Sequence, residues 1–201
     1  MKNAALKIDK KETADIILEA AVNRFSIYGY NKTTMAEIAE DAGMSAANIY
    51  RFYKNKEEIA AACATNKMAE KTEALKHIVR DISLSASEKL TQYAHTLLQM
   101  TQKAANENNK IDEICIEITN HRPDVIHNQI KNECALLVEI LSYGNQTQEF
   151  MVDDVIKTAG AINASLVLFD VPKFMPLFSE EEFREKLQNV IDLILVGLKT
   201  R

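Results

Sequence analysis

Three closely spaced helix starts in the N-terminal part of this chain constrain its fold more than any other feature. Thr34 and Glu37 have the spacing of a capping box, Ser45 is the N-cap of a following helix, and Asn55 begins a fourth helix. The second and third helices are separated only by Gly43-Met44. Because this connection is too short for antiparallel packing, it predicts a steep crossing, which is the geometry of a helix-turn-helix.

The rest of the chain also has helical periodicity, with apolar residues recurring at steps of three and four. Only 5 Gly and 3 Pro occur in 201 residues, which favours long helices, and no strand pattern is present. Residues 1–11 are expected to form a flexible arm and residues 171–178 a loop. The expected helices are 13–28, 34–43, 45–53, 55–79, 87–105, 111–119, 123–144, 153–169 and a last one that Ser179 caps and that continues to Leu198.

Composition excludes several classes of protein. No apolar run is long enough for a membrane span, and the Lys-rich N-terminus lacks the apolar segment of a secretory signal. Three distant cysteines predict neither a disulfide framework nor a zinc site, and they favour a reducing, cytoplasmic setting. Each cysteine could be either a small core residue or a redox sensor. The net charge of −5 belongs to residues 63–201, because residues 1–62 carry 9 basic and 9 acidic residues. A local basic stripe for nucleic acid is therefore compatible with the acidic total.

A longer pattern extends through the predicted helix-turn-helix. In order, it holds a glycine and an aromatic after the first helix, Thr-Thr, Ile-Ala, Ala-Gly-x-Ser at the turn, and Ile-Tyr-x-Phe-Tyr-x-x-Lys-Glu-Glu at the end. This pattern resembles the TetR/AcrR family of bacterial transcription regulators. The resemblance is tight from Thr13 to Cys63 and beyond that covers only a general helical layout. Many members of the family have Lys and Gly where this chain has Ala46 and Ala47, which weakens the generic grip on phosphate.

The chemistry of the third helix is suited to reading DNA. Its capped N-terminus directs amides toward phosphate, Asn pairs with adenine, Arg with guanine, and Ala meets a thymine methyl. Thr, Tyr and Lys around it can position the backbone without reading sequence. The predicted DNA-binding residues are Thr34, Ser45, Ala46, Ala47, Asn48, Tyr50, Arg51, Lys54 and Lys56.

Each of these residues also has a structural interpretation. Phe52 and Tyr53, adjacent at a helix end, are expected to pack, whereas Tyr50 is expected to face away from Ile49. Asn48 could serve only as the N3 partner of the Ser45 cap, and Arg51 only as a solvated charge. No nucleophile–base pair, phosphate-binding glycine loop or metal-ligand spacing is present, so neither a cofactor nor a metal is predicted.

We therefore expect an all-α fold with an N-terminal three-helix helix-turn-helix domain, residues 1–54, and a C-terminal helical effector-binding and dimerisation domain, residues 55–201. The resemblance implies a homodimer whose effector tilts the fourth helix and releases the DNA operator. An apolar small-molecule effector is expected at Leu97, Met100, Ile114, Cys115, Ile118, Leu137 and Leu141. The dimer interface is expected at Ala159, Ala161, Ile162, Leu187, Val190, Ile191, Ile194 and Leu198.

Two other functions stay open at this level. One is a helical carrier or enzyme that retains a vestigial helix-turn-helix, which the basic residues from Arg51 to Lys56 disfavour. The other is a DNA-binding protein controlled by a partner rather than by a small ligand. The operator sequence, the effector and the direction of regulation are not encoded in any pattern recognised above.

Overall fold

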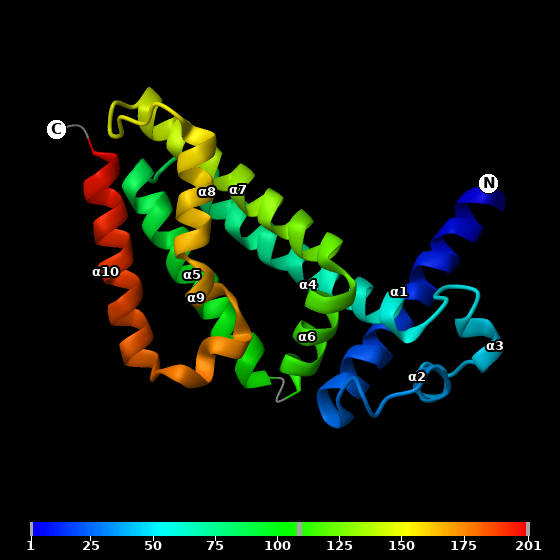
Figure 1. The fold of residues 1–201 in the computed structure, drawn as a ribbon. Helices are drawn as coiled ribbons and strands as arrows, with labels where there is room; N and C mark the ends of the chain where they lie inside the picture. The colour runs from blue at the N-terminus through cyan, green and yellow to red at the C-terminus, as the bar shows by residue number, and fades with distance from the viewer. Residues whose placement is uncertain (1, 108–109, 200–201) are drawn as a thin grey trace. The chain divides into compact units, whose positions relative to one another are not determined.

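The computed structural model describes residues 2–107 and 110–199, and within them the predicted all-α fold is confirmed (Figure 1). The one β-type pairing in these ranges is an isolated antiparallel bridge between Phe150 and Lys199. No helix in the described part of the chain is both long and apolar enough to cross a membrane. The elements are α1 (Lys2–Tyr28), α2 (Met35–Asp41), α3 (Ala46–Ile49), α4 (Lys56–Val79), α5 (Ala86–Glu107), α6 (Ile111–His121), α7 (Pro123–Gln146), α8 (Val155–Ser165), α9 (Val167–Asp170), the 3₁₀ helix η1 (Pro172–Leu177) and α10 (Glu180–Leu198).

The predicted helix starts are confirmed by their caps. The Thr34 hydroxyl accepts a hydrogen bond from the Glu37 N–H, and the Glu37 carboxylate accepts one from the Thr34 N–H, which closes the capping box of α2. Asn55 Oδ1 accepts from the Glu58 N–H at the start of α4. A second capping box at Ser179 starts α10. Caps are predictable because their donors and acceptors lie within one turn of each other.

Three elements differ from the expectation. Helix α1 begins at Lys2 rather than Thr13, and the segment expected to be an arm is rich in Lys and also contains Ala and Leu, all of which favour helix. The helix expected over 153–169 is divided at Leu166 into α8 and α9. Before this division the Ser165 hydroxyl donates to the Ile162 carbonyl, a back-bond that competes with helical pairing. The expected loop 171–178 contains η1.

The structure divides into two compact units. The first comprises the described residues up to Lys67 together with Glu107–Ile126, and the second comprises Met68–Asn106 and the described residues from His127 onward. A boundary at residue 54 follows from the end of the helix-turn-helix pattern. The structure groups the first half of α4 and all of α6 with that pattern, and the boundary at residue 54 stays a prediction.

The core of the second unit draws on six helices. It includes Leu75 from α4, Tyr93 from α5, Leu137 from α7, Phe169 from α9 and Phe183 from α10, all at most 1% exposed. Helix α8 contributes to the same cluster, and the rings of Phe169 and Phe183 meet edge to face, 6.2 Å apart. Side chains of this size, buried from all sides, fix the helices of the unit against one another.

Candidate functional site

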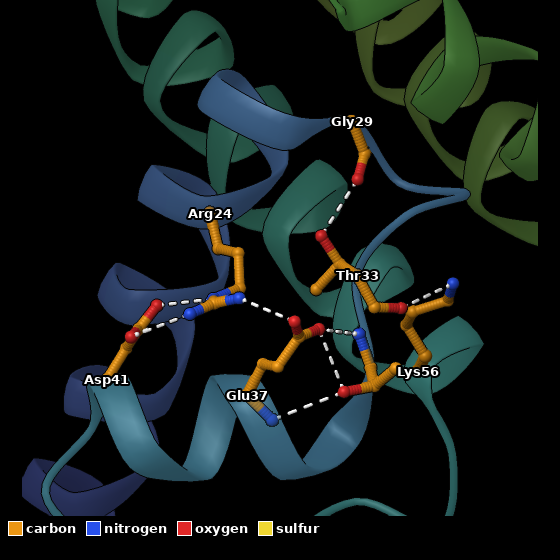
Figure 2. A network of polar contacts seen from close by, with 7 residues as sticks. Arg24, Gly29, Thr33, Glu37, Asp41 and Lys56 are labelled. Atoms are coloured by element: carbon orange, nitrogen blue, oxygen red, sulfur yellow. Dashed lines mark hydrogen bonds and ion pairs between the residues drawn. The ribbon is translucent and has the colours of Figure 1, made fainter.

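Helix α2 is held against α1 by a charged contact. Arg24 of α1 donates through Nε to Asp41 at 2.5 Å and pairs through Nη1 with Glu37 at 3.1 Å, as Figure 2 shows. The hydrogen bonds from Thr34 and, secondarily, the Arg24 charge hold the pKa of Glu37 below its usual range. Arg24 therefore holds α2 against α1 at both ends of α2, through Glu37 near its start and Asp41 at its end.

The connection into α3 contains a left-handed glycine. Gly43 adopts φ +67°, a left-handed conformation that residues with a Cβ rarely take. Ser45 then caps α3, its hydroxyl accepting from the Asn48 N–H at 3.3 Å. Helix α3 itself is a single turn, Ala46–Ile49, followed by further hydrogen-bonded turns up to Tyr53.

A single buried residue fixes which side of α3 faces outward. Ile49 is 0% exposed, whereas the neighbouring Tyr50 is 54% exposed. Ala46, Ala47 and Arg51 are also exposed, and Asn48 is half-buried, with its N–H engaged by the Ser45 cap. This places the predicted base-contacting side chains on the accessible part of the turn. Their contact with DNA stays a prediction.

The end of this segment separates packing residues from accessible ones. Phe52 and Tyr53 are half-buried, as expected for packing aromatics, and burial raises the pKa of Tyr53. The Lys54 side chain is 88% exposed, with its Nζ 3.9 Å from a Glu58 carboxylate oxygen. Thr34 and Ser45 are exposed, but both hydroxyls accept hydrogen bonds from their own helix starts.

Lys56 has a role that the sequence pattern did not reveal. Its Nζ donates to the carbonyl oxygens of Tyr30 at 2.7 Å and Thr33 at 2.8 Å, and it lies 4.1 Å from the centre of the Tyr30 ring. The Thr33 hydroxyl donates in turn to the Gly29 carbonyl (Figure 2). Burial lowers the pKa of Lys56. Since an ammonium has three N–H donors, one remains for the phosphate contact predicted for Lys56.

Helix α6 contacts the same α1–α2 connection. The Tyr30 hydroxyl donates to Glu117 Oε1 at 2.9 Å, and the Asn31 N–H donates to Glu113 Oε2 at 2.9 Å. Burial and the bond to Glu117 raise the pKa of Tyr30. Gly29 has φ +87°, and a Cβ there would lie 2.6 Å from Glu113 Oε1. No sequence signal marked Glu113 or Glu117, because carboxylates on a short helix are ordinarily solvated.

The residues predicted to bind an effector fall in both units. Leu97, Leu137 and Leu141 are buried in the core of the second unit, and Met100 is half-buried on α5. On α6, in the first unit, Ile118 is buried, and Ile114 and Cys115 are half-buried.

The residues predicted for the dimer interface differ in burial within the single chain. Five of the eight residues are at most 5% exposed within the single chain, so they offer no surface to a second copy. Ala161 is exposed, and Val190 and Ile194 are half-buried. The apolar side chains that α8 and α10 do expose are Ile156, at 74%, and Leu193 and Val196, each at 75%. The five residues buried in the chain's own core are Ala159, Ile162, Leu187, Ile191 and Leu198.

The cysteines differ in burial. Cys63 is 5% exposed, its thiol donating to the Leu18 carbonyl at 3.8 Å, and burial raises its pKa to about 12. A thiol that ionises so late is a poor nucleophile at neutral pH, which supports the core interpretation for this residue. Cys115 and Cys134 are half-buried.

Comparison with known families matches both units of the chain. The family model described as bacterial regulatory proteins, tetR family, matches residues 17–63. A second model, described as tetracyclin repressor-like, C-terminal domain, matches residues 86–191, which is more than half of the chain.

Two curated relatives from Bacillus subtilis match part of the chain. The HTH-type transcriptional regulator YhgD is 40% identical over 65 residues, which is 32% of this chain and 32% of that protein. The fatty acid metabolism regulator protein is 32% identical over 74 residues, 37% of this chain and 38% of that protein. The chain thus spans about a third of the length of these relatives.

Solved structures match nearly the whole chain in fold. A transcriptional regulator from Cytophaga hutchinsonii aligns with TM-score 0.70 at 22% identity, covering 92% of this chain and 98% of that one. The fatty acid degradation regulator FadR from Bacillus halodurans gives TM-score 0.65 at 22% identity, with 94% and 97% covered. RolR in complex with resorcinol gives TM-score 0.66 at 16% identity, with 96% and 90% covered.

Proposed function

This chain belongs to the tetR family of bacterial regulatory proteins, and we propose that it is a homodimeric repressor that a small, largely apolar effector releases from a palindromic operator. Membership makes it a transcriptional regulator with a helix-turn-helix DNA-binding domain. The repressor role, the palindrome and the release by ligand are the parts that we propose.

The observation that carries the proposal is the accessible side of α3. Ala46, Ala47, Tyr50 and Arg51 are exposed around the buried Ile49, and Ser45 caps the helix in front of them. Asn48 and Arg51 read base edges in our proposal, and the small alanines allow close approach to the major groove. Thr34, Tyr50, Lys54 and the remaining N–H of Lys56 position the phosphates.

The proposed second copy binds the exposed apolar residues of α8 and α10. Ile156, Leu193 and Val196 are large apolar side chains that are each about three-quarters exposed. Such exposure on a soluble regulator is typical of a surface that is buried in its assembly. A dimer of this kind would present two copies of α3 to half-sites about 34–36 Å apart, which is the reason to expect a palindrome.

The effector is proposed to bind in the second unit, near Leu97, Leu137 and Leu141. Two similar regulators are named for fatty acid metabolism or degradation, and a third was solved with the small aromatic resorcinol. Their ligands do not transfer at this level of identity. They support only the proposal that a compact, mostly apolar molecule fits a helical core of this fold.

Helix α6 takes part in the proposed response, since it is grouped with the DNA-binding helices. Glu113 and Glu117 bind the α1–α2 connection at Asn31 and Tyr30. We propose that an effector acts on DNA affinity by shifting α4, and that these bonds on α6 make the connection move with it. The required energy is small, because a coupling of 1–3 kcal/mol changes affinity about 5–150-fold.

The proposal is tested with the full-length protein and a randomised DNA library. We expect enrichment of an inverted repeat, and loss of binding in Ala47→Glu, which adds a negative charge to the exposed side of α3. Ala69→Glu, an equivalent change on an exposed position of α4, is the matched control and should bind as the unmodified protein does. Failure to enrich any sequence, or equal binding by both variants, would contradict the DNA-reading role.

A further inference from the structure

A buried polar cluster lies inside the second unit, apart from the residues discussed above. Lys71 of α4 places its Nζ 2.7 Å from Glu133 Oε1 of α7 and 2.6 Å from Asp170 Oδ1 at the end of α9. The side chain of Glu133 is 2% exposed, that of Lys71 13% and that of Asp170 21%. We call Lys71, Glu133 and Asp170 the charged cluster.

The two carboxylates are satisfied to different degrees. Glu133 Oε1 also accepts from Gln129 Nε2 at 2.6 Å, and its Oε2 accepts from Asn163 Nδ2 at 2.9 Å. Asp170 is bound through Oδ1 by Lys71. Burial raises the pKa of Asp170 to about 6, since the Lys71 charge only partly offsets the loss of hydration and the repulsion from Glu133.

Tyr93 provides a second, independent observation. Its side chain on α5 is 0% exposed, and its hydroxyl is without a hydrogen-bond partner among the described residues. Tyr93 and Phe169, the neighbour of Asp170 in the chain, belong to the same buried core cluster. Burial and the negative charges of Glu133 and Asp170 raise the pKa of Tyr93. A buried hydroxyl left unsatisfied lowers stability, and a ligand that bonds to it recovers this cost.

The charges determine which ligand fits. One ammonium and two carboxylates leave a net charge of −1, because Gln129 and Asn163, which bond to Glu133, are neutral. The core cluster of the same unit is apolar and includes Leu97 and Phe169. A cation brings this region to neutrality, whereas a carboxylate ligand would bring it to −2 at a high cost in desolvation. A neutral alcohol can bond to Tyr93 but leaves the charge unbalanced.

Building on the proposed regulatory function, we propose that Tyr93 and Asp170, beside Glu133, form the polar end of the effector site and bind a protonated amine carried on an apolar body. The amine N–H groups donate to the phenol oxygen of Tyr93 and to the Asp170 carboxylate. The ligand then competes with Lys71 for Asp170. Because Lys71 is on α4, weakening this bond changes the position of the helix that leads into the DNA-binding unit.

The test compares three probes of equal chain length: octylamine, octanol and octanoate at pH 7.5, below their aggregation concentrations. Binding to the full-length protein is measured by calorimetry. We expect octylamine to bind at least about tenfold more tightly than octanoate, because a charge-assisted bond contributes more than one decade in affinity. Equal affinities, a preference for octanoate, or binding by none of the probes would overturn the inference.

Two nearly isosteric variants test which residues cause the preference for the amine. Asp170→Asn and Tyr93→Phe should each reduce octylamine affinity several-fold or more. Asp170→Asn should leave octanol affinity within about twofold, whereas Tyr93→Phe should also weaken octanol, because an alcohol can bond to the same phenol. Asp192→Asn on α10 and Tyr143→Phe on α7 are the matched controls and should retain the amine preference. Circular dichroism reports whether each variant keeps its helical content. An amine preference that survives both cluster substitutions would refute the assignment.

The outcomes also separate this inference from the proposed function. If the protein binds an operator and is released by an apolar compound whose affinity neither substitution changes, the regulatory proposal stands and the amine site is wrong. If the protein binds no specific DNA while octylamine binding depends on Asp170 and Tyr93, the site is right and the regulatory proposal fails.

Discussion

Replacing Lys56 with Met should separate a positioning role from a phosphate contact. Methionine keeps most of the length of the side chain and removes the two bonds to the Tyr30 and Thr33 carbonyls, at 2.7 and 2.8 Å. A hydrogen bond from a charged donor contributes about 1.5–3 kcal/mol, and the partial exposure of Lys56 reduces the total. We therefore expect a loss of about 2 kcal/mol in the free energy of unfolding, or about 4–8 °C in Tm for a chain of this length.

DNA binding by the same variant is measured as a function of salt, with Lys54→Met as the matched control. The Lys54 side chain is 88% exposed, so its loss should leave Tm unchanged and lower the slope of log affinity against log salt by about one per subunit. Lys56→Met should weaken binding to all sequences with a smaller change in slope, because most of its effect acts through the α1–α2 connection. An unchanged Tm for Lys56→Met would refute this reasoning.

Three further outcomes are expected. Asn48→Ala and Arg51→Ala should each cost about 1–3 kcal/mol on the best operator and relax one base pair per half-site in a library selection, and unchanged base preference would exclude a reading role. Leu193→Asp should give monomers by sedimentation while Asn189→Asp on the same helix does not, since only the first removes exposed apolar surface. Because the pKa of Asp170 is raised to about 6, the folded state keeps a proton that the unfolded chain loses, so this group favours folding less as pH rises from about 4 to 6. The stability difference between the unmodified protein and Asp170→Asn should therefore fall over that range in denaturant titrations, and a rise would contradict the sign.

Local chemistry is where the sequence was most informative. The capping boxes at Thr34 and Ser179 and the cap at Asn55 each depend on atoms within one helical turn, and all three helix starts were predicted correctly. The break at Leu166 was missed because the competing bond from the Ser165 hydroxyl to the Ile162 carbonyl leaves no pattern in the apolar periodicity.

Helix faces and long-range contacts were harder to predict. Apolar residues surround much of α10, so periodicity could not decide between the side that holds Leu187 and the opposite side that holds Leu193, and the structure buries Leu187 in the chain's own core. The bond from Lys56 to the Tyr30 carbonyl depends on how separate helices pack, so residue spacing in the sequence does not predict it. The helix-turn-helix was recognisable only because its residues lie in one continuous segment.

Helix α4 connects the two proposals physically. Lys56 at its start binds the α1–α2 connection, and Lys71 binds Glu133 and Asp170 in the core of the second unit. Helix α4 contains neither Gly nor Pro between the two lysines. We therefore propose that a ligand that takes Asp170 from Lys71 acts through α4, the helix whose first residue binds the α1–α2 connection. Since coupling is reciprocal, operator DNA must weaken the amine by the factor by which the amine weakens DNA.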